Sequence, residues 1–196
     1  MCEIGYDGAC GTEPSKCQCK PVQASNLLSL SQDMLTLLED PEGGDVTLLL
    51  RGERIKAYKN ILVARSTYFR NMFASGMSES QAEEIPLDED PEAFKAALKF
   101  LYSGLAPDNL DEVAIRLLPV ADKYMLDELK QVCDSAIRRI LSIENVLDIL
   151  VMTENHNFCE LFEYCLPFFK ANVNRLNKND MNKLDKKLLV KLLRSE

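Results

Sequence analysis

Three short β-rich runs, surrounded by helical periodicities, limit the folds that this chain can adopt. The runs are VTLLL at Val46–Leu50, IKAY at 55–58 and EEIPL at 83–87. The turn RGER joins the first two runs, which makes them a plausible hairpin. Pro86 places the third run at a sheet edge or at the end of a strand. The sequence therefore predicts a small sheet among many helices, an α+β fold.

The helix with the clearest predicted boundaries follows the third run. Asp90 fits an N-cap and Pro91 fits the first helical position. Gly104 and Pro107 mark its end. Its apolar face consists of Phe94, Leu98 and Leu101. Helical spacing also predicts two short helices at 59–66 and 67–73 and two longer ones at 113–124 and 126–141.

A second, all-helical region is predicted to begin near Ser142. The run SIEN offers Ser142 as the N-cap of a helix, and NFCE has the form of a capping box, with Asn157 and Glu160 three residues apart. Pro167 should kink or terminate the helix that follows. Asp185 can cap a last helix whose inward residues are Leu188, Leu189, Leu192 and Leu193.

Composition and charge disfavour several classes of protein. The chain has 196 residues, of which 46% are hydrophobic, enough to bury a core without metal or disulfide bridges. Its net charge of -8 argues against a nucleic-acid surface. No apolar run reaches the roughly 18 residues of a membrane helix. Because the N-terminus lacks signal-peptide order, we expect a cytoplasmic or nuclear location, or both.

The cysteines form two groups. Zinc ligation by the first group is one hypothesis, but its spacing matches no common zinc site and no histidine is nearby. The alternative is a disordered tail with reduced thiols, interrupted by glycine and proline. We therefore predict no metal and no cofactor. The first group is Cys2, Cys10, Cys17 and Cys19; the second, predicted to be buried as small hydrophobes, is Cys133, Cys159 and Cys165.

Catalytic patterns are weak throughout the sequence. A nucleophile–histidine–acid arrangement would have to use His156, the single histidine. The run EGGD lacks the spacing and the lysine of a phosphate-binding loop. We therefore predict a non-catalytic binding module.

A stripe of apolar residues precedes the sheet. Leu27, Leu30, Met34 and Leu37 recur at helical spacing and make a face too apolar to meet water. Such a face packs either on its own domain or on a second copy of the chain. The stripe by itself leaves both arrangements open.

Several separated segments resemble the BTB/POZ domain family. They are GDVTLLL, KNILVARSTYFRNMF, IPLDEDPEAFKAALKFLYSG and ADKYMLDELKQVCDSAI. The resemblance covers 26–141, and 142–196 resembles the helical BACK-type extension of many BTB proteins. Residues 1–25 then form a disordered, cysteine-containing tail. The chain is similar to cullin-3 adaptors of the speckle-type POZ protein and leucine-zipper-like transcription regulator kind.

This resemblance implies a homodimer, with the leading helix exchanged across a two-fold axis, and a partner. The partner is the N-terminal domain of cullin-3, so the chain would recruit an unknown protein substrate to a ubiquitin ligase. The family's cullin-binding motif, an apolar residue, any residue, then glutamate, matches Met77, Ser78 and Glu79. An unbranched methionine adapts to an apolar pocket, and a carboxylate accepts hydrogen bonds at its rim.

Two alternatives to this interpretation stay open. Met77 could instead pack back onto Phe73 beside a solvated Glu79. The chain could also be a BTB dimerisation scaffold that does not bind cullin, such as a transcriptional regulator or corepressor platform.

One position departs from the family pattern. The family usually has Ala-His-Lys where this chain has Ala57, Tyr58 and Lys59. The family histidine typically meets the aspartate that corresponds here to Asp45. Because a tyrosine hydroxyl is also a donor, the resemblance leads us to predict a structural pair between Asp45 and Tyr58.

Overall fold

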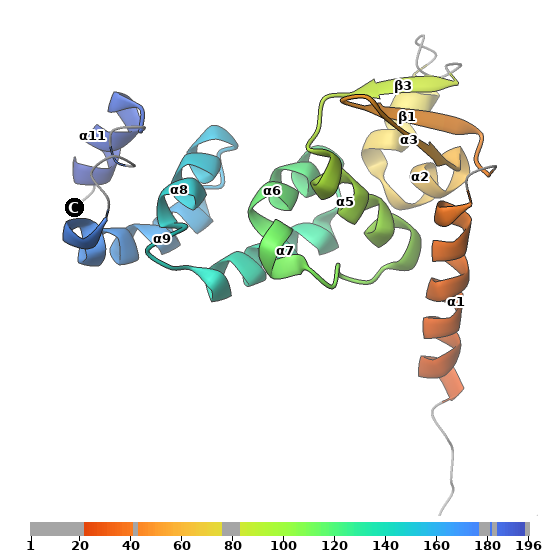
Figure 1. Cartoon of the computed structure of the whole chain (residues 1–196), viewed down its shortest axis with the longest axis horizontal. Helices are drawn as coiled ribbons and strands as arrows, with labels where there is room; N and C mark the ends of the chain where they lie inside the picture. Colours follow the sequence, from red (N-terminus) through yellow and green to blue (C-terminus); the bar gives the residue numbers. More distant parts are fainter. Residues whose placement is uncertain (1–21, 41–42, 76–82, 177–180, 182–183, 195–196) are drawn as a thin grey trace, which may run out of the picture.

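The computed structural model describes residues 22–40, 43–75, 83–176, 181 and 184–194 and contains the predicted small sheet among helices (Figure 1). The strands are β1 (Val46–Leu50), β2 (Glu53–Ala57) and β3 (Glu84–Leu87). The helices are α1 (Val22–Glu39), α2 (Lys59–Arg65), α3 (Thr67–Ala74), α5 (Pro91–Ser103), α6 (Leu110–Lys123), α7 (Asp127–Ile140), α8 (Val146–Asn155), α9 (Cys159–Asn172), the 3-10 turn η1 (Val173–Arg175) and α11 (Lys186–Arg194).

The sheet has the strand order β2-β1-β3. Strands β1 and β2 pair antiparallel as the predicted hairpin, and β3 runs parallel to β1 with Ile85 opposite Leu48. Alternate side chains of β1 are buried, so one face of the sheet packs on the helices. Pro86 is exposed on the edge strand β3, which confirms the position predicted for it.

Helix α5 lies at the centre of the core. Helices α1, α2 and α6 pack against it, and its predicted apolar face, Phe94, Leu98 and Leu101, is buried. At its C-terminal end Gly104 has φ +71°, the left-handed conformation that ends many helices. Both predicted boundaries of this helix are confirmed.

Aromatic side chains join α3 to α5 and α6. The ring of Phe69 stacks 5.1 Å from that of Tyr124, which also meets Phe94 edge-on at 5.2 Å. Ser66 is fully buried, caps α3 by accepting the Phe69 N–H, and donates from Oγ to the main-chain oxygen of Tyr124 at 2.7 Å. The start of α3 is therefore tied to the end of α6.

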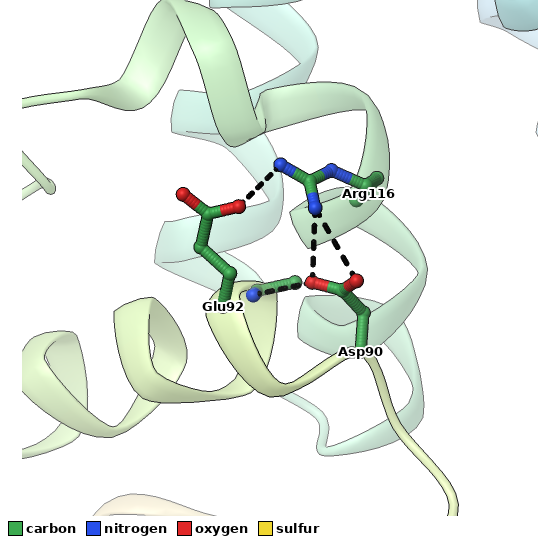
Figure 2. A network of polar contacts seen from close by, with 4 residues as sticks. Asp90, Glu92 and Arg116 are labelled. Carbon is green, nitrogen blue, oxygen red and sulfur yellow. Dashed lines mark hydrogen bonds and ion pairs between the residues drawn. The ribbon is translucent and has the colours of Figure 1, made fainter.

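The N-terminal end of α5 carries a polar network (Figure 2). Asp90 is the N-cap, and its Oδ1 accepts the Ala93 N–H at 2.9 Å. The guanidinium of Arg116, on α6, bridges Asp90 at 3.3 Å and Glu92 at 2.6 Å. The Ala93 N–H, followed by the charge of Arg116, lowers the pKa of Asp90.

Asp90→Ala should lower the free energy of unfolding by about 1 kcal/mol at pH 7, because the cap acceptor is lost. The folded pKa of Asp90 lies below its unfolded value, so the carboxylate contributes fully above the unfolded pKa. That contribution fades as the pH falls through the folded pKa, and the difference from the wild type should shrink below about pH 4. Urea unfolding across pH measures both effects.

Asp90→Asn is the control, because it keeps an acceptor and should retain most of the neutral-pH stability without this pH dependence. Equal stability of Asp90→Ala and the wild type at pH 7 would contradict the role of Asp90 as a cap.

The C-terminal part of the chain is helical, as predicted, and lies at the opposite end of the molecule from the sheet (Figure 1). Helix α8 packs on α6 and α9, and α9 packs on α7. Leu188 and Leu192 of α11 are buried, in agreement with the predicted inward face. The helical region therefore continues the packing of α6 and α7.

Two predicted helix caps in this region are wrong. Asn145, not Ser142, occupies the N-cap position of α8. Its side chain accepts the Ser142 N–H and donates to the Ile140 carbonyl, so it bridges the connection between α7 and α8. Phe158 occupies the N-cap position of α9, and Asn157 takes the left-handed φ of +58° instead of capping, a conformation that asparagine tolerates.

Two further expectations concern α9. Pro167 does not terminate the helix, which continues to Asn172, so of the two effects predicted for this proline only the kink stays a prediction. Pro167 and Glu163 are both exposed, so water can reach the carbonyl that the proline leaves unbonded. Cys159 is exposed, because it starts the helix at its surface, whereas Cys133 and Cys165 are buried as predicted.

Candidate protein-interaction surfaces

Helix α1 projects from the body of the molecule and is attached mainly through its C-terminal half (Figure 1). Met34, Leu35 and Leu38 are half-buried against the core. Ser31 Oγ donates to the main-chain oxygen of Ser103, at the end of α5, at 2.8 Å. Residues 26–30, nearer the N-terminal end of α1, are exposed.

The accessible surface of α1 is rich in leucine. Leu27, Leu28, Leu30 and Leu37 are 64%, 60%, 56% and 41% exposed. Of the four residues predicted for dimerisation, three are thus exposed, and Met34 packs on its own domain. The body covers only part of the apolar face of α1, and the rest is an apolar surface available to a partner.

Asp45 lies just before β1 and Tyr58 just after β2, so the two residues are neighbours. Among the hydrogen bonds of the described residues, none joins their side chains, in contrast to the predicted pair. Asp45 Oδ1 instead accepts the main-chain N–H of Lys59 at 2.6 Å, at the start of α2. The Tyr58 hydroxyl is directed at Gly43, where a Cβ would lie 2.8 Å from it. The main-chain donor of Lys59 thus takes the place that we expected for the hydroxyl.

Met77 and Glu79, predicted to bind cullin, lie outside the described residues. The helix before them is described: Phe69 is fully buried, and Met72 and Phe73 are half-buried against the core, as expected for the start of that run. Ser75 Oγ donates to the Met72 carbonyl at 2.8 Å at the end of α3. The chain therefore enters this segment from a well-anchored helix.

A groove of about 870 Å³ lies between α7 and the turn from α8 to α9. Its apolar lining includes Leu118, Phe158 and Leu161, and Lys130 Nζ lies 5.3 Å from the centre of the Phe158 ring. Sequence reasoning made no site prediction here. A phenylalanine, Phe158, just before a helix with an acidic first turn is the sequence feature that could have indicated this groove. The acidic lining consists of Asp127, Asp134 and Glu160.

Several features of the described residues bear on their chemistry. Burial raises the pKa of the Cys133 thiol to about 12 and that of Cys165 to about 11, so both thiols stay neutral. Among the residues with described positions, His, Cys, Asp and Glu form no group of three that could hold a metal ion. Cys2, Cys10, Cys17 and Cys19 lie outside that part of the chain. None of the described helices is long and apolar enough to cross a membrane.

Comparison with known proteins gives consistent matches. The family model of the BTB/POZ domain matches residues 35–141. BTB/POZ domain-containing protein 9 of Drosophila melanogaster is 37% identical over 169 residues, which are 85% of this chain and 23% of that protein. This chain therefore spans about a quarter of the length of that curated relative.

Solved structures of BTB domains are also similar to this chain. The BTB domain of zebrafish PATZ1 has a TM-score of 0.50 and 22% identity, covering 59% of this chain and 94% of that domain. The BTB domain of human gigaxonin has a TM-score of 0.43 and 25% identity, covering 66% of this chain and 97% of that domain. The similarity to the PATZ1 domain shows that the small sheet and its surrounding helices have the BTB fold.

Proposed function

We propose, since this chain belongs to the BTB/POZ domain family, that it is a homodimeric adaptor that binds the N-terminal domain of cullin-3. It would recruit a protein substrate to a cullin–RING ubiquitin ligase in the cytoplasm, the nucleus or both. BTB domains are protein-interaction modules that mediate dimerisation. The adaptor itself contributes no catalytic residue in this proposal.

The exposed apolar face of α1 is the observation that carries the dimer. Leu27, Leu30 and Leu37 keep two fifths or more of their surface in water on a helix that projects from the body. Covering them with the same face of a second chain removes apolar area from water on both sides of a two-fold axis. Single exposed leucines are common, but a row of them along one helix favours an interface.

The cullin partner is supported by two features. Met77 and Glu79 match the family's cullin-binding motif and follow a helix anchored by Phe69. The groove between α7 and the α8–α9 turn offers a second surface, with apolar and acidic lining suited to an extended basic or apolar segment. We propose that residues 26–141 form the BTB domain and that 142–196 form a BACK-like region, so that the groove lies between the two, with α7 on one side and the α8–α9 turn on the other.

Calorimetric titration with the cullin-3 N-terminal domain tests the adaptor. The wild type should bind, and a Met77→Asp, Glu79→Lys variant should lose about 30-fold or more in affinity, as expected when a binding hot spot is removed. Val190→Asp is the matched control: it places a charge at an exposed apolar residue of α11, at the far end of the molecule, and should bind like the wild type.

The outcomes separate the two candidate functions. If neither protein binds, the adaptor fails and a BTB scaffold without cullin, such as a transcriptional regulator or corepressor platform, remains. If the wild type and the double variant bind equally, cullin binding stands but its contact lies away from Met77 and Glu79.

A further inference from the structure

Strands β2 and β3 are the two edges of the sheet, because the strand order is β2-β1-β3. The Thr47 N–H donates to the Glu83 carbonyl, so the main-chain groups at every second residue of β3, starting from Glu84, point away from β1. Pro86 is one of these outward positions, and a proline has no N–H to offer. The edge at β3 therefore lacks a donor that a further strand would need.

The edge at β2 carries no proline. A two-residue turn at 51–52, whose φ angles are both positive, joins β1 to β2 in the geometry of a type I′ hairpin. In such a hairpin the flanking residues, Leu50 and Glu53, are a hydrogen-bonded pair, and bonded and non-bonded pairs then alternate along the ladder. The N–H and C=O groups of Arg54 and Lys56 therefore point away from β1, and no other described strand pairs with them.

The side chains of β2 give this edge a chemical preference. Arg54 and Lys56 are both exposed on one face of the sheet, and Ile55 between them packs against the core on the other face. Arg54 pairs with Glu84 on β3, whereas Lys56 is in no ion pair among the described residues. A strand added at this edge would thus meet two cations on one face and an isoleucine on the other.

We propose that β2 is a docking edge for an extended segment of a partner protein, added antiparallel, in which two acidic residues flank an apolar one. The acidic residues lie opposite Arg54 and Lys56 and exchange main-chain hydrogen bonds with them, and the apolar residue lies beside Ile55. In such strand addition the main chain supplies affinity and the side chains supply selectivity. The docking edge needs neither the dimer nor cullin binding, since none of these residues belongs to the exposed leucines of α1 or lines the groove at α7.

A second copy of the chain is the other candidate occupant, and charge disfavours it. If two β2 strands paired antiparallel about a two-fold axis at Ile55, each Arg54 would lie directly opposite the Lys56 of the second copy. Like charges at directly opposite positions destabilise a strand pair. Basic residues on an edge strand are one way in which sheets avoid pairing with themselves. The same two charges favour an acidic segment, so the edge discriminates between the two occupants.

NMR titration of the isotope-labelled full chain with the capped peptide Gly-Thr-Glu-Val-Glu-Thr-Gly tests the docking edge. The main-chain amide signals of Arg54 and Lys56 should shift most, and their hydrogen exchange with water should slow, because their N–H groups gain acceptors. The Ile55 amide already donates to β1 and should exchange slowly with or without the peptide. Such a short strand should bind weakly, with a dissociation constant on the order of 1 mM.

Altered peptides are the matched controls on the ligand side. Methylation of both glutamate nitrogens removes the donors that face β2 and should abolish the shifts. Methylation of the valine nitrogen, which points away from β2, should leave them in place. The peptide Gly-Thr-Lys-Val-Lys-Thr-Gly should bind at least about tenfold more weakly, because its lysines lie opposite two cations.

Variants at position 56 separate the main chain from the charge. Lys56→Pro removes the outward N–H, as Pro86 does on β3, and should lose the binding of the acidic peptide. Lys56→Glu keeps the N–H and should bind the lysine peptide better than the acidic one, the reverse of the wild type. Lys170→Glu makes the same charge change at an exposed residue of α9, away from the sheet, and should behave like the wild type.

Three outcomes would overturn the docking edge. The first is an absence of shifts at Arg54 and Lys56 with the acidic peptide at up to about 5 mM, several times the expected dissociation constant. The second is equal binding of the acidic and lysine peptides by the wild type. The third is slowed exchange of these two amides that grows with protein concentration in the absence of peptide, which would assign the edge to a second copy.

Discussion

Leu30→Asp combined with Leu37→Asp should give a monomer at concentrations where the wild type is a dimer. Both leucines are exposed in the single chain, so their replacement leaves the core intact. In a two-fold interface the change places four carboxylates in a region that must lose water. Burying unpaired charges costs several kcal/mol, and we expect the dissociation constant to rise at least about 100-fold. Light scattering and sedimentation equilibrium measure the change directly.

Ser29→Asp combined with Thr36→Asp is the matched control for this prediction. These two residues have the same seven-residue spacing as Leu30 and Leu37, but they lie about 100° further round the helix. Both are exposed and polar. This control adds the same charge to the same helix and should remain dimeric. A dimer formed by the leucine variant would show that the interface lies elsewhere, and monomers from both variants would point to the net charge of α1 instead of its apolar face.

Phe69→Ala should lower the free energy of unfolding by about 3 to 5 kcal/mol, the largest stability change that we predict. The Phe69 ring is fully buried and lies 5.1 Å from the ring of Tyr124, 5.6 Å from Tyr68 and 6.2 Å from Phe73. Its removal leaves a cavity between α3 and α6 and takes away these ring contacts. Urea unfolding at a fixed protein concentration in the monomerised background gives the value without a contribution from dimer dissociation.

Two further variants serve as comparisons for Phe69→Ala. Phe69→Leu keeps most of the buried volume and should lose clearly less stability than Phe69→Ala. Tyr164→Ala removes an aromatic ring that is 46% exposed on α9 and should cost much less. Similar losses for Phe69→Ala and Tyr164→Ala would mean that the aromatic group around Tyr124 does not hold α3. The same variants in the cullin titration would show whether the anchoring of α3 also matters for the segment that carries Met77.

The parts of the fold that were predictable from sequence have local causes. Asp90 and Gly104 mark the ends of α5 because cap hydrogen bonds and a left-handed terminus depend on residues close in the chain. Pro86 indicated an edge strand because it cannot donate to a ladder. The stripe of α1 gave the correct helix and three of the four exposed positions. Local rules were sufficient at these positions because each depends on a standard cap, helix end or strand edge.

The corrections arise where a side chain bridges the connection between two helices, where the backbone is unusual, or where a contact comes from a distant part of the chain. Asn145 takes the N-cap position of α8 because its side chain bridges to the end of α7, a contact that capping patterns do not encode. Asn157 adopts a left-handed φ where a capping box needs an extended residue. Met34 packs on the core of its own domain because α1 lies against α5, a contact that periodicity alone cannot give.

The sequence by itself determined the helices, the three short strands and the apolar character of α1, since periodicity, caps and turns are properties of neighbouring residues. Only the tertiary structure decided which leucines of α1 stay in water, where the Tyr58 hydroxyl goes and that a groove lies between α7 and the turn from α8 to α9. Those outcomes depend on how α1 packs on α5, how Gly43 approaches Tyr58, and how α7 faces the turn from α8 to α9. Burial and hydrogen bonding across such junctions are set by packing between segments far apart in the chain.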